Sequence, residues 1–140
     1  MAETARLLPD LDDPVTAPFW KAARAHELRF QKCARCSYVR WPPSPVCPNC
    51  LEPGGEWTQM SGTGTIWSFG IYDHVYDPSL RGAIPYNVTL VELDEGPRLI
   101  TNLVGVELDA IRIGMRVTPV FEAVSDAVTL VKFRPLADGQ

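Results

Sequence analysis

Four cysteines, arranged as two pairs, constrain this chain more than any other feature of its sequence. Cys33 and Cys36 form one C-x2-C pair, and Cys47 and Cys50 form a second pair after ten intervening residues. A C-x2-C pair closes a tight loop that turns two sulfurs toward one ion. Two facing loops complete a tetrahedral shell with Zn–S bonds of about 2.3 Å. The spacing therefore predicts a zinc ribbon that holds one structural Zn²⁺.

Three other uses of four cysteines compete with a structural zinc. Two disulfides would suit a secreted protein. Iron in a redox role is compatible with four sulfur ligands, but Ser37 and Leu51 stand where glycine often follows the second cysteine of such loops. A catalytic zinc needs an open coordination position, and four cysteines close the shell. Structural zinc is our prediction, with these three as alternatives.

The N-terminal segment, residues 1–14, bears on the compartment in which these thiols operate. It carries four acids and one arginine and has no apolar run, so it lacks the pattern of a secretory signal. No apolar stretch of the sequence approaches the roughly 20 residues that cross a bilayer. We therefore expect a cytoplasmic protein whose thiols stay reduced, which disfavours disulfides.

Charge is distributed unevenly along the chain, whose net charge is −4. Residues 21–60 carry six basic and three acidic side chains, whereas residues 61–140 carry six basic and ten acidic ones. The basic middle could meet phosphate groups of a ligand. Alternatively, Lys32, Arg35 and Arg40 offset the negative charge of a zinc bound to four thiolates. Both interpretations stay open.

The pattern predicts a mainly β fold with one helix near its N-terminus. Residues 1–17 are polar and are expected to be flexible. Pro18 suits a first helical position, and a helix of about three turns should follow. The spacing places four residues on one face of that helix: Phe19, Ala22, Ala23 and His26. Residues 30–58 are rich in Cys and Pro. Proline lacks a backbone N–H donor and disfavours the α conformation of the residue before it, so this segment is predicted to be a short hairpin and not a helix.

The remainder of the chain reads as a small barrel. Five β-like segments are separated by Gly or Pro: Thr65–His74, Asn87–Leu93, Arg98–Val104, Arg116–Glu122 and Ala127–Phe133. In the first, alternation places Trp67, Phe69 and Ile71 on one side. Five short strands with no convincing helix favour an OB-fold. The expected organisation is a flexible 1–17, a helix plus rubredoxin-like zinc ribbon over 18–60, a five-stranded OB-fold barrel over 61–135, and a tail over 136–140.

Little else in the sequence could carry chemistry. His26 is expected to pack or cap, and His74, with Tyr72 and Tyr76 nearby, to line a groove for a partner or ligand. Neither a nucleophile-elbow motif nor a P-loop accompanies them. The chain therefore looks poorly equipped as a stand-alone catalyst.

Large aromatic side chains gather in the helix-plus-ribbon region, which is too small to bury them all. They are Phe19, Trp20, Trp41 and Trp57. Exposed aromatic residues anchor protein interfaces. We expect Phe19, Trp20 and Trp41 to take part in binding a partner.

Several short motifs, taken in order, resemble those of a known family. They are PFW at 18–20, LRFQKC at 28–33, the ribbon cysteines, GTG at 62–64, LDEG at 93–96, IG at 113–114 and FRP at 133–135. This ordered set resembles the zinc-ribbon plus OB-fold proteins once grouped as domain of unknown function 35. The resemblance covers residues 15–135. Ser37 departs from it, because many relatives have glycine there.

The resemblance implies a non-catalytic subunit of an enzyme complex. Members typically assemble with thiolase-fold enzymes, including acetyl-CoA acetyltransferase-like proteins and lipid-transfer-protein-like aldolases that shorten the acyl-CoA side chains of steroids. Only the four cysteines carry over as functional positions. We add the hypothesis that Arg24, Arg29 and Lys32 contact CoA phosphates.

Two other functions compete with an accessory subunit. A nucleic-acid-binding module is possible, since ribbons and OB barrels both serve that purpose, but the acidic barrel half and a pI of about 5.1 argue against it. An independent enzyme or redox protein is the third hypothesis.

Overall fold

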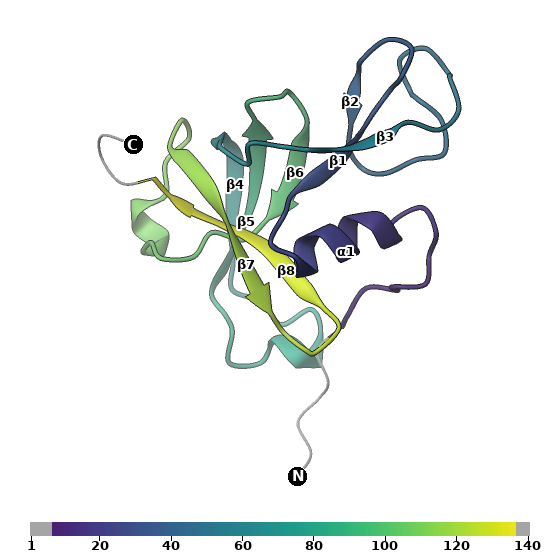
Figure 1. Cartoon of the computed structure of the whole chain (residues 1–140). Helices are drawn as coiled ribbons and strands as arrows, with labels where there is room; N and C mark the ends of the chain where they lie inside the picture. Colours follow the sequence, from purple (N-terminus) through teal and green to yellow (C-terminus); the bar gives the residue numbers. More distant parts are fainter. Residues whose placement is uncertain (1–6, 137–140) are drawn as a thin grey trace.

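The computed structural model describes residues 7–136 of the chain. A small ribbon projects from one side of a twisted barrel, and the helix lies beside the barrel under the ribbon (Figure 1). The predicted fold class is therefore confirmed. Of the predicted ends, residues 1–6 and 137–140 lie outside the described residues. Turns follow at residues 11–12 and 14–16, and Asp13 O accepts from the N–H groups of Thr16 and Ala17.

Helix α1 spans Ala17–Arg24, with Pro18 in its first turn. Phe19, Ala22 and Ala23 are buried as predicted, but the helix has eight residues and is shorter than three turns. His26 ends it, with a left-handed backbone (φ 62°). The N–H of His26 donates to Ala23 O and that of Glu27 to Ala22 O, which is the Schellman pattern of a helix C-terminus.

His26 therefore does not share the buried face of α1, so that part of the prediction is wrong. Its ring stacks on Phe121 of the barrel at 5.3 Å between centroids. The expectation that His26 packs or caps is confirmed, because it does both.

The ribbon sheet has three short antiparallel strands in the order β2-β1-β3. They are β1 (Arg29–Lys32), β2 (Val39–Arg40) and β3 (Glu56–Gln59). The cysteines lie in the loops beyond these strands, so the sheet is the base of the ribbon. Met60 N donates to Leu28 O at 2.7 Å, which ties the ribbon's exit to its entry just before the barrel begins.

The five predicted barrel strands are present in the order β6-β5-β4-β7-β8. They are β4 (Gly64–Tyr72), β5 (Tyr86–Leu93), β6 (Arg98–Thr101), β7 (Arg116–Ala123) and β8 (Thr129–Pro135). Two 3₁₀ turns, η1 (Pro78–Leu80) and η2 (Leu108–Ala110), lie in the connections. After β6 the chain crosses to β8, where Leu103 and Phe133 form a parallel bridge. This bridge nearly closes the barrel.

A β-bulge in β4 changes the alternation expected from the sequence. The pairing with β5 shifts between Ile66 and Ser68, so Trp67 is an extra residue on the bulged strand. Trp67 is 48% exposed, whereas Phe69 packs against the core. The prediction that Trp67 and Phe69 share one side is therefore wrong.

One hydrophobic core joins all three parts of the molecule. Phe19 of α1 and Phe30 of β1 belong to the same buried cluster as Ile66, Val91 and Phe133 of the barrel. The helix thus packs between the ribbon base and the barrel. The division into separate units at residue 60 stays a prediction. No helix within residues 7–136 has the length and apolar character needed to span a membrane.

Candidate metal centre and docking surfaces

The two cysteine pairs form two loops with the same local geometry. In the first, Ser37 N donates to Cys33 O at 3.0 Å and Cys33 N donates to Tyr38 O at 2.9 Å. In the second, Leu51 N donates to Cys47 O at 2.8 Å, and Cys47 N donates to Glu52 O at 2.9 Å. The repeated pattern turns both pairs of sulfurs toward the same point.

The residue after each second cysteine has a left-handed backbone. Ser37 has φ 66° and Leu51 has φ 68°. Glycine adopts this conformation without steric cost, whereas other L-residues pay about 1–2 kcal/mol. Both loops therefore have the left-handed backbone for which glycine is best suited. Serine in place of glycine at position 37 does not move the four sulfurs apart.

The four sulfurs lie as close together as ligands of one ion. Their Sγ atoms are all within 4.8 Å of one another. Cys33 and Cys50 are 3.6 Å apart, and Cys36 and Cys47 are 3.7 Å apart. A regular tetrahedron with Zn–S bonds of about 2.3 Å has edges of about 3.8 Å. The four side chains thus fit a tetrahedral four-sulfur shell around one ion.

Hydrogen bonds to Cys33 and Cys36 favour the thiolate forms of these two residues. The backbone N–H groups of Cys36 and Arg35 point at Cys33 Sγ and lower the pKa of Cys33. The Asn49 amide and the Tyr38 N–H lower the pKa of Cys36 to about 6. The Glu52 N–H lowers the pKa of Cys50, but burial and the three neighbouring sulfurs outweigh it and raise the pKa to about 12. Adjacent negative charges disfavour one another, and a divalent cation bound among the four sulfurs would offset that repulsion.

Arg40 holds the ribbon together from inside, a role that sequence reasoning missed. Its side chain is only 2% exposed. The guanidinium donates to Gln31 Oε1 at 3.1 Å, to Ser44 O at 2.8 Å and to Gly54 O at 2.6 Å. Arg40 therefore ties β1 and β2 to the loops on both sides of the second cysteine pair. Its placement inside the ribbon had no signal in the sequence beyond its basic charge.

The predicted partner-binding aromatic residues form one cluster, but differ in exposure. Phe19 contacts Trp20 at 4.9 Å and Trp41 at 4.7 Å between ring centroids, and Trp41 stacks on Phe30 at 4.7 Å. Phe19 is 4% exposed, whereas Trp20 and Trp41 are partly buried. Phe19 therefore lies beneath the other two rings, and only Trp20 and Trp41 of the three are partly exposed, so their partner-binding role stays a prediction.

The three cations predicted to contact CoA phosphates lie in different surroundings. Arg29 Nε pairs with Glu27 at 3.1 Å, and its Nη1 donates to Trp57 O at 3.3 Å. Lys32 is exposed at the end of β1. Arg24 is exposed at the last turn of α1. Arg29 therefore binds neighbouring groups of the same chain, whereas Arg24 and Lys32 are exposed on the surface.

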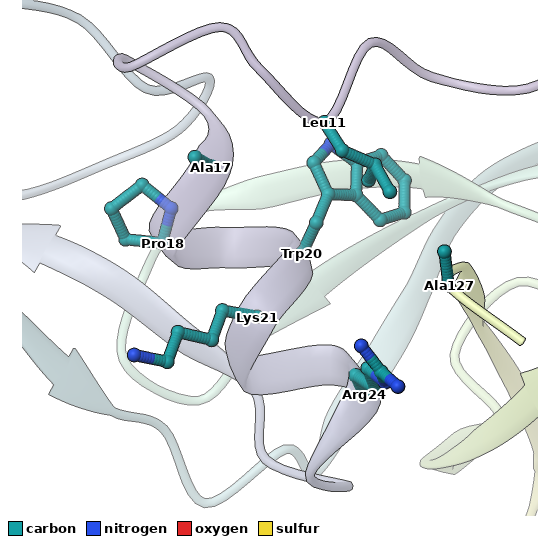
Figure 2. A pocket seen from close by; sticks show the side chains of 7 residues that line it. All are labelled: Leu11, Ala17, Pro18, Trp20, Lys21, Arg24 and Ala127. Carbon is teal, nitrogen blue, oxygen red and sulfur yellow. The ribbon is translucent and has the colours of Figure 1, made fainter.

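A hollow of about 480 Å³ lies between α1 and the segment that precedes it. Leu11, Ala17, Pro18, Trp20 and Ala127 give it apolar walls, and the cations Lys21 and Arg24 border it. Leu11 lies over the Trp20 indole, and the Arg24 guanidinium points to the side on which Trp20 and Ala127 lie (Figure 2). Lys21 was not predicted to matter, although its position three residues before Arg24 on a helix could have indicated it.

A second apolar surface covers the outer face of β4, β5 and β6. A hollow of about 300 Å³ lies on it. Trp67 and Ile100 are 48% and 70% exposed, and Arg98 lies over the Trp67 ring at 4.0 Å. Beyond them, Tyr72 stacks on Tyr86, and Tyr76 packs edge-on against His74. The bulge in β4 places Trp67 on this surface, and it is not visible in the sequence pattern.

A four-cysteine ribbon joined through one core to a five-stranded barrel defines a zinc-ribbon plus OB-fold protein. Family models match both parts: "ChsH2, rubredoxin-like zinc ribbon domain" over residues 20–54 and "ChsH2, C-terminal OB-fold domain" over residues 57–122. The chain belongs to the ChsH2/DUF35 family, as the sequence resemblance predicted.

Relatives connect this family with enzyme complexes. A solved structure titled "Ltp2-ChsH2(DUF35) aldolase" matches with a TM-score of 0.81 and 38% identity over 91% of this chain and 98% of that one. A "Probable enoyl-CoA hydratase alpha subunit" of Thermomonospora curvata is 42% identical over 84% of this chain and 36% of its own length. The "3-oxo-4,17-pregnadiene-20-carboxyl-CoA hydratase alpha subunit" of Mycobacterium tuberculosis is 37% identical over 73% of this chain and 32% of its own. The chain thus spans about a third of these two relatives.

Proposed function

We propose that this chain is a non-catalytic accessory subunit of a thiolase-fold acyl-CoA enzyme, of the kind that shortens steroid side chains by aldol cleavage. The observation that carries the proposal is the 38% identity to the ChsH2(DUF35) chain of an Ltp2-ChsH2 aldolase, which this chain matches over 98% of that chain's length. Steroid acyl-CoA chemistry also appears in the name of the Mycobacterium tuberculosis relative.

In this proposal one Zn²⁺ is structural and is held by Cys33, Cys36, Cys47 and Cys50. Bound zinc would supply cross-linking of the two loops rather than Lewis-acid catalysis, because four protein ligands leave no position for a substrate. The N–H donors around Cys33 and Cys36 would hold the thiolates ready for the ion. Cysteines that bind a metal must stay reduced, as they do in the cytoplasm. The proposal therefore includes a cytoplasmic location.

In the complex, residues of this chain would anchor the partner and attract the phosphates of acyl-CoA. Trp20 and Trp41 lie over a well-packed aromatic support, so they can anchor a partner with little loss of side-chain freedom. Lys32, which is exposed, is the better candidate for attracting the phosphates of a bound acyl-CoA; Arg24 is exposed as well, but it borders the hollow beside α1. Arg29 suits this role less, because Glu27 already pairs with it.

Nucleic-acid binding receives less support than an accessory role. Ring stacking on the outer face of β4–β6 would need nearby cations for phosphates. Arg98 lies over the Trp67 ring, but it also pairs with Glu92 at 2.9 Å. We expect retention of single-stranded DNA on a filter to be negligible at both low and high salt, where true phosphate binding falls steeply as salt rises.

Co-expression tests the proposed role directly. The chain is expressed with a lipid-transfer-protein-like thiolase subunit encoded near it, and only the thiolase-like subunit carries an affinity tag. We expect the two to purify together in a fixed ratio and the thiolase-like subunit to be less soluble alone. A Cys47→Ser variant should co-purify poorly. Failure of the wild-type chain to bind or to increase the solubility of any such subunit would overturn the proposal.

A further inference from the structure

The hollow beside α1 and a second hollow share one lining residue, Trp20. The first, of about 480 Å³, has Leu11 and Arg24 at its edges. The second, of about 210 Å³, runs between Trp41, β6 and β8 toward Lys132. Trp20 lines both. We call the two hollows together the α1 groove, and Trp20 is the side chain that its two halves share.

Unpaired positive charge borders one half of this groove. The ion pairs within residues 7–136 use Arg29, Arg35, Arg98, Arg116 and Lys132 as their cations. Lys21 and Arg24 are in none of them, and both are exposed. Asp10 and Asp13 lie in the segment before α1 and do not line this half of the groove; each accepts the backbone N–H of the residue two positions later. The charged residues that line this half of the groove, Lys21 and Arg24, are both cations, so a guest with negative charge would meet them there.

The shape of the groove favours a polypeptide segment over a compact small molecule. Apolar residues line both of its halves, and Lys21 and Arg24 border only the half beside Leu11. An amphipathic segment could place one apolar side chain in each hollow and its carboxylates beside Lys21 and Arg24. Tryptophan and arginine are also the residues that most often dominate binding energy at protein interfaces.

We propose that the α1 groove is the recognition site for an acidic segment of the partner subunit, with apolar side chains that straddle Trp20. This inference rests on the proposed function and specifies its docking surface. Arg24 provides the main attraction, because its guanidinium lies on the same side of α1 as the indole (Figure 2). Lys21 extends in a different direction from the helix and widens the positive border.

Affinity measurements on the co-expressed pair test this assignment. The probe is the lipid-transfer-protein-like thiolase subunit, titrated against wild-type chain and against a Lys21→Glu, Arg24→Glu double variant by interferometry at two salt concentrations. Both residues are exposed, so the double variant should fold as the wild type does. Arg81→Glu, which reverses another exposed charge at the C-terminal end of η1, is the matched control.

We expect the double variant to bind at least tenfold more weakly, with a smaller dependence on salt, and Arg81→Glu to bind within twofold of wild type. Trp20→Ala should also lose affinity, whereas Trp20→Phe should retain most of it. Wild-type affinity in the double variant would overturn the groove assignment and leave the accessory role intact. Absence of any wild-type complex would overturn both. Wild-type self-association that the double variant abolishes would assign the groove to a second copy of this chain instead.

Discussion

The side-chain amide of Asn87 forms hydrogen bonds with both the N–H and the C=O of Leu103, at the side where the barrel closes. Asn87 Oδ1 accepts the Leu103 N–H at 2.7 Å, and Nδ2 donates to Leu103 O at 2.9 Å. Thr89 Oγ1 also donates to Oδ1 at 2.8 Å, and the Asn87 side chain is 5% exposed. One side chain thus fixes the crossing from β6 to β8 at the point where the barrel closes.

Replacing Asn87 with Leu should destabilise the protein strongly. It leaves the N–H and C=O of Leu103 buried without partners, at about 1–3 kcal/mol for each. We expect a loss of about 2–4 kcal/mol in the free energy of unfolding, measured by urea titration. Thr89→Val, which removes a single hydrogen bond at a fully buried position, is the control and should cost about 1 kcal/mol. Equal costs for the two variants would contradict the closing role of Asn87.

Asp94 joins the turn after β5 to the start of the barrel and should make stability depend on pH. Arg116 donates to both of its carboxylate oxygens, at 2.7 and 2.8 Å, and Thr63 Oγ1 donates at 2.7 Å. The Arg116 guanidinium, followed by Thr63, lowers the pKa of Asp94 from 3.8 to about 2. A lowered pKa means that this stabilisation is present above pH 3.8 and disappears as the pH falls through about 2.

Asp94→Asn should therefore reduce the free energy of unfolding at neutral pH by about 0.5–1 kcal/mol, because the pair is partly exposed. Acid also releases metal from both proteins, so the quantity to compare is the difference between them at each pH. That difference should shrink between pH 4 and pH 2. A difference that stays constant over this interval would show that the Asp94 charge contributes nothing.

Leu51 offers a test of the strain in the second cysteine loop. It is 72% exposed with φ 68°, so its side chain gains little from packing. Leu51→Gly should raise the free energy of unfolding by about 0.5–1 kcal/mol, since the relieved strain exceeds the added freedom of the unfolded chain. Leu51→Ala keeps a Cβ and should give no gain. If both variants behave alike, backbone strain is not the cause.

Metal removal should loosen the ribbon before it affects the barrel. The wild-type protein should contain one zinc per chain by elemental analysis and show no visible absorption, unlike an iron site with four sulfur ligands. After chelation, amide hydrogen exchange should accelerate over residues 33–55 while β5 and β7, which pack around Val91 and Val117, stay protected. Zinc added back should restore protection. A ribbon equally protected without metal would contradict a structural ion.

The sequence predicted most of the fold because its strongest signals are local. Two C-x2-C pairs specify a ribbon, and five segments punctuated by Gly or Pro specify the strands of a small barrel. The predicted helix was longer than the observed one, because the apolar pattern continues to Leu28, whereas the left-handed backbone of His26 ends the helix. Nothing in the side-chain pattern shows that a histidine will adopt the left-handed C-terminal position.

The parts of the site that the sequence did not reveal depend on contacts between distant residues. In the sequence, Arg40 is one of several cations near the cysteines. In the structure it is buried and donates to the Ser44 and Gly54 carbonyls. Trp67 alternates normally in the sequence, and only the bulge against β5 moves it outward. The α1 groove requires Leu11, Trp20 and Ala127 to meet, which no spacing rule predicts.

Turnover of a steroid side-chain acyl-CoA thioester by each component, alone and together, tests the central claim most directly. We predict no turnover by this chain, little by the thiolase-like subunit, and restored activity when the two are combined, with less restoration by the Cys47→Ser variant. Conversion of the thioester by this chain alone would contradict a non-catalytic accessory role, and so would full activity of the thiolase-like subunit without it.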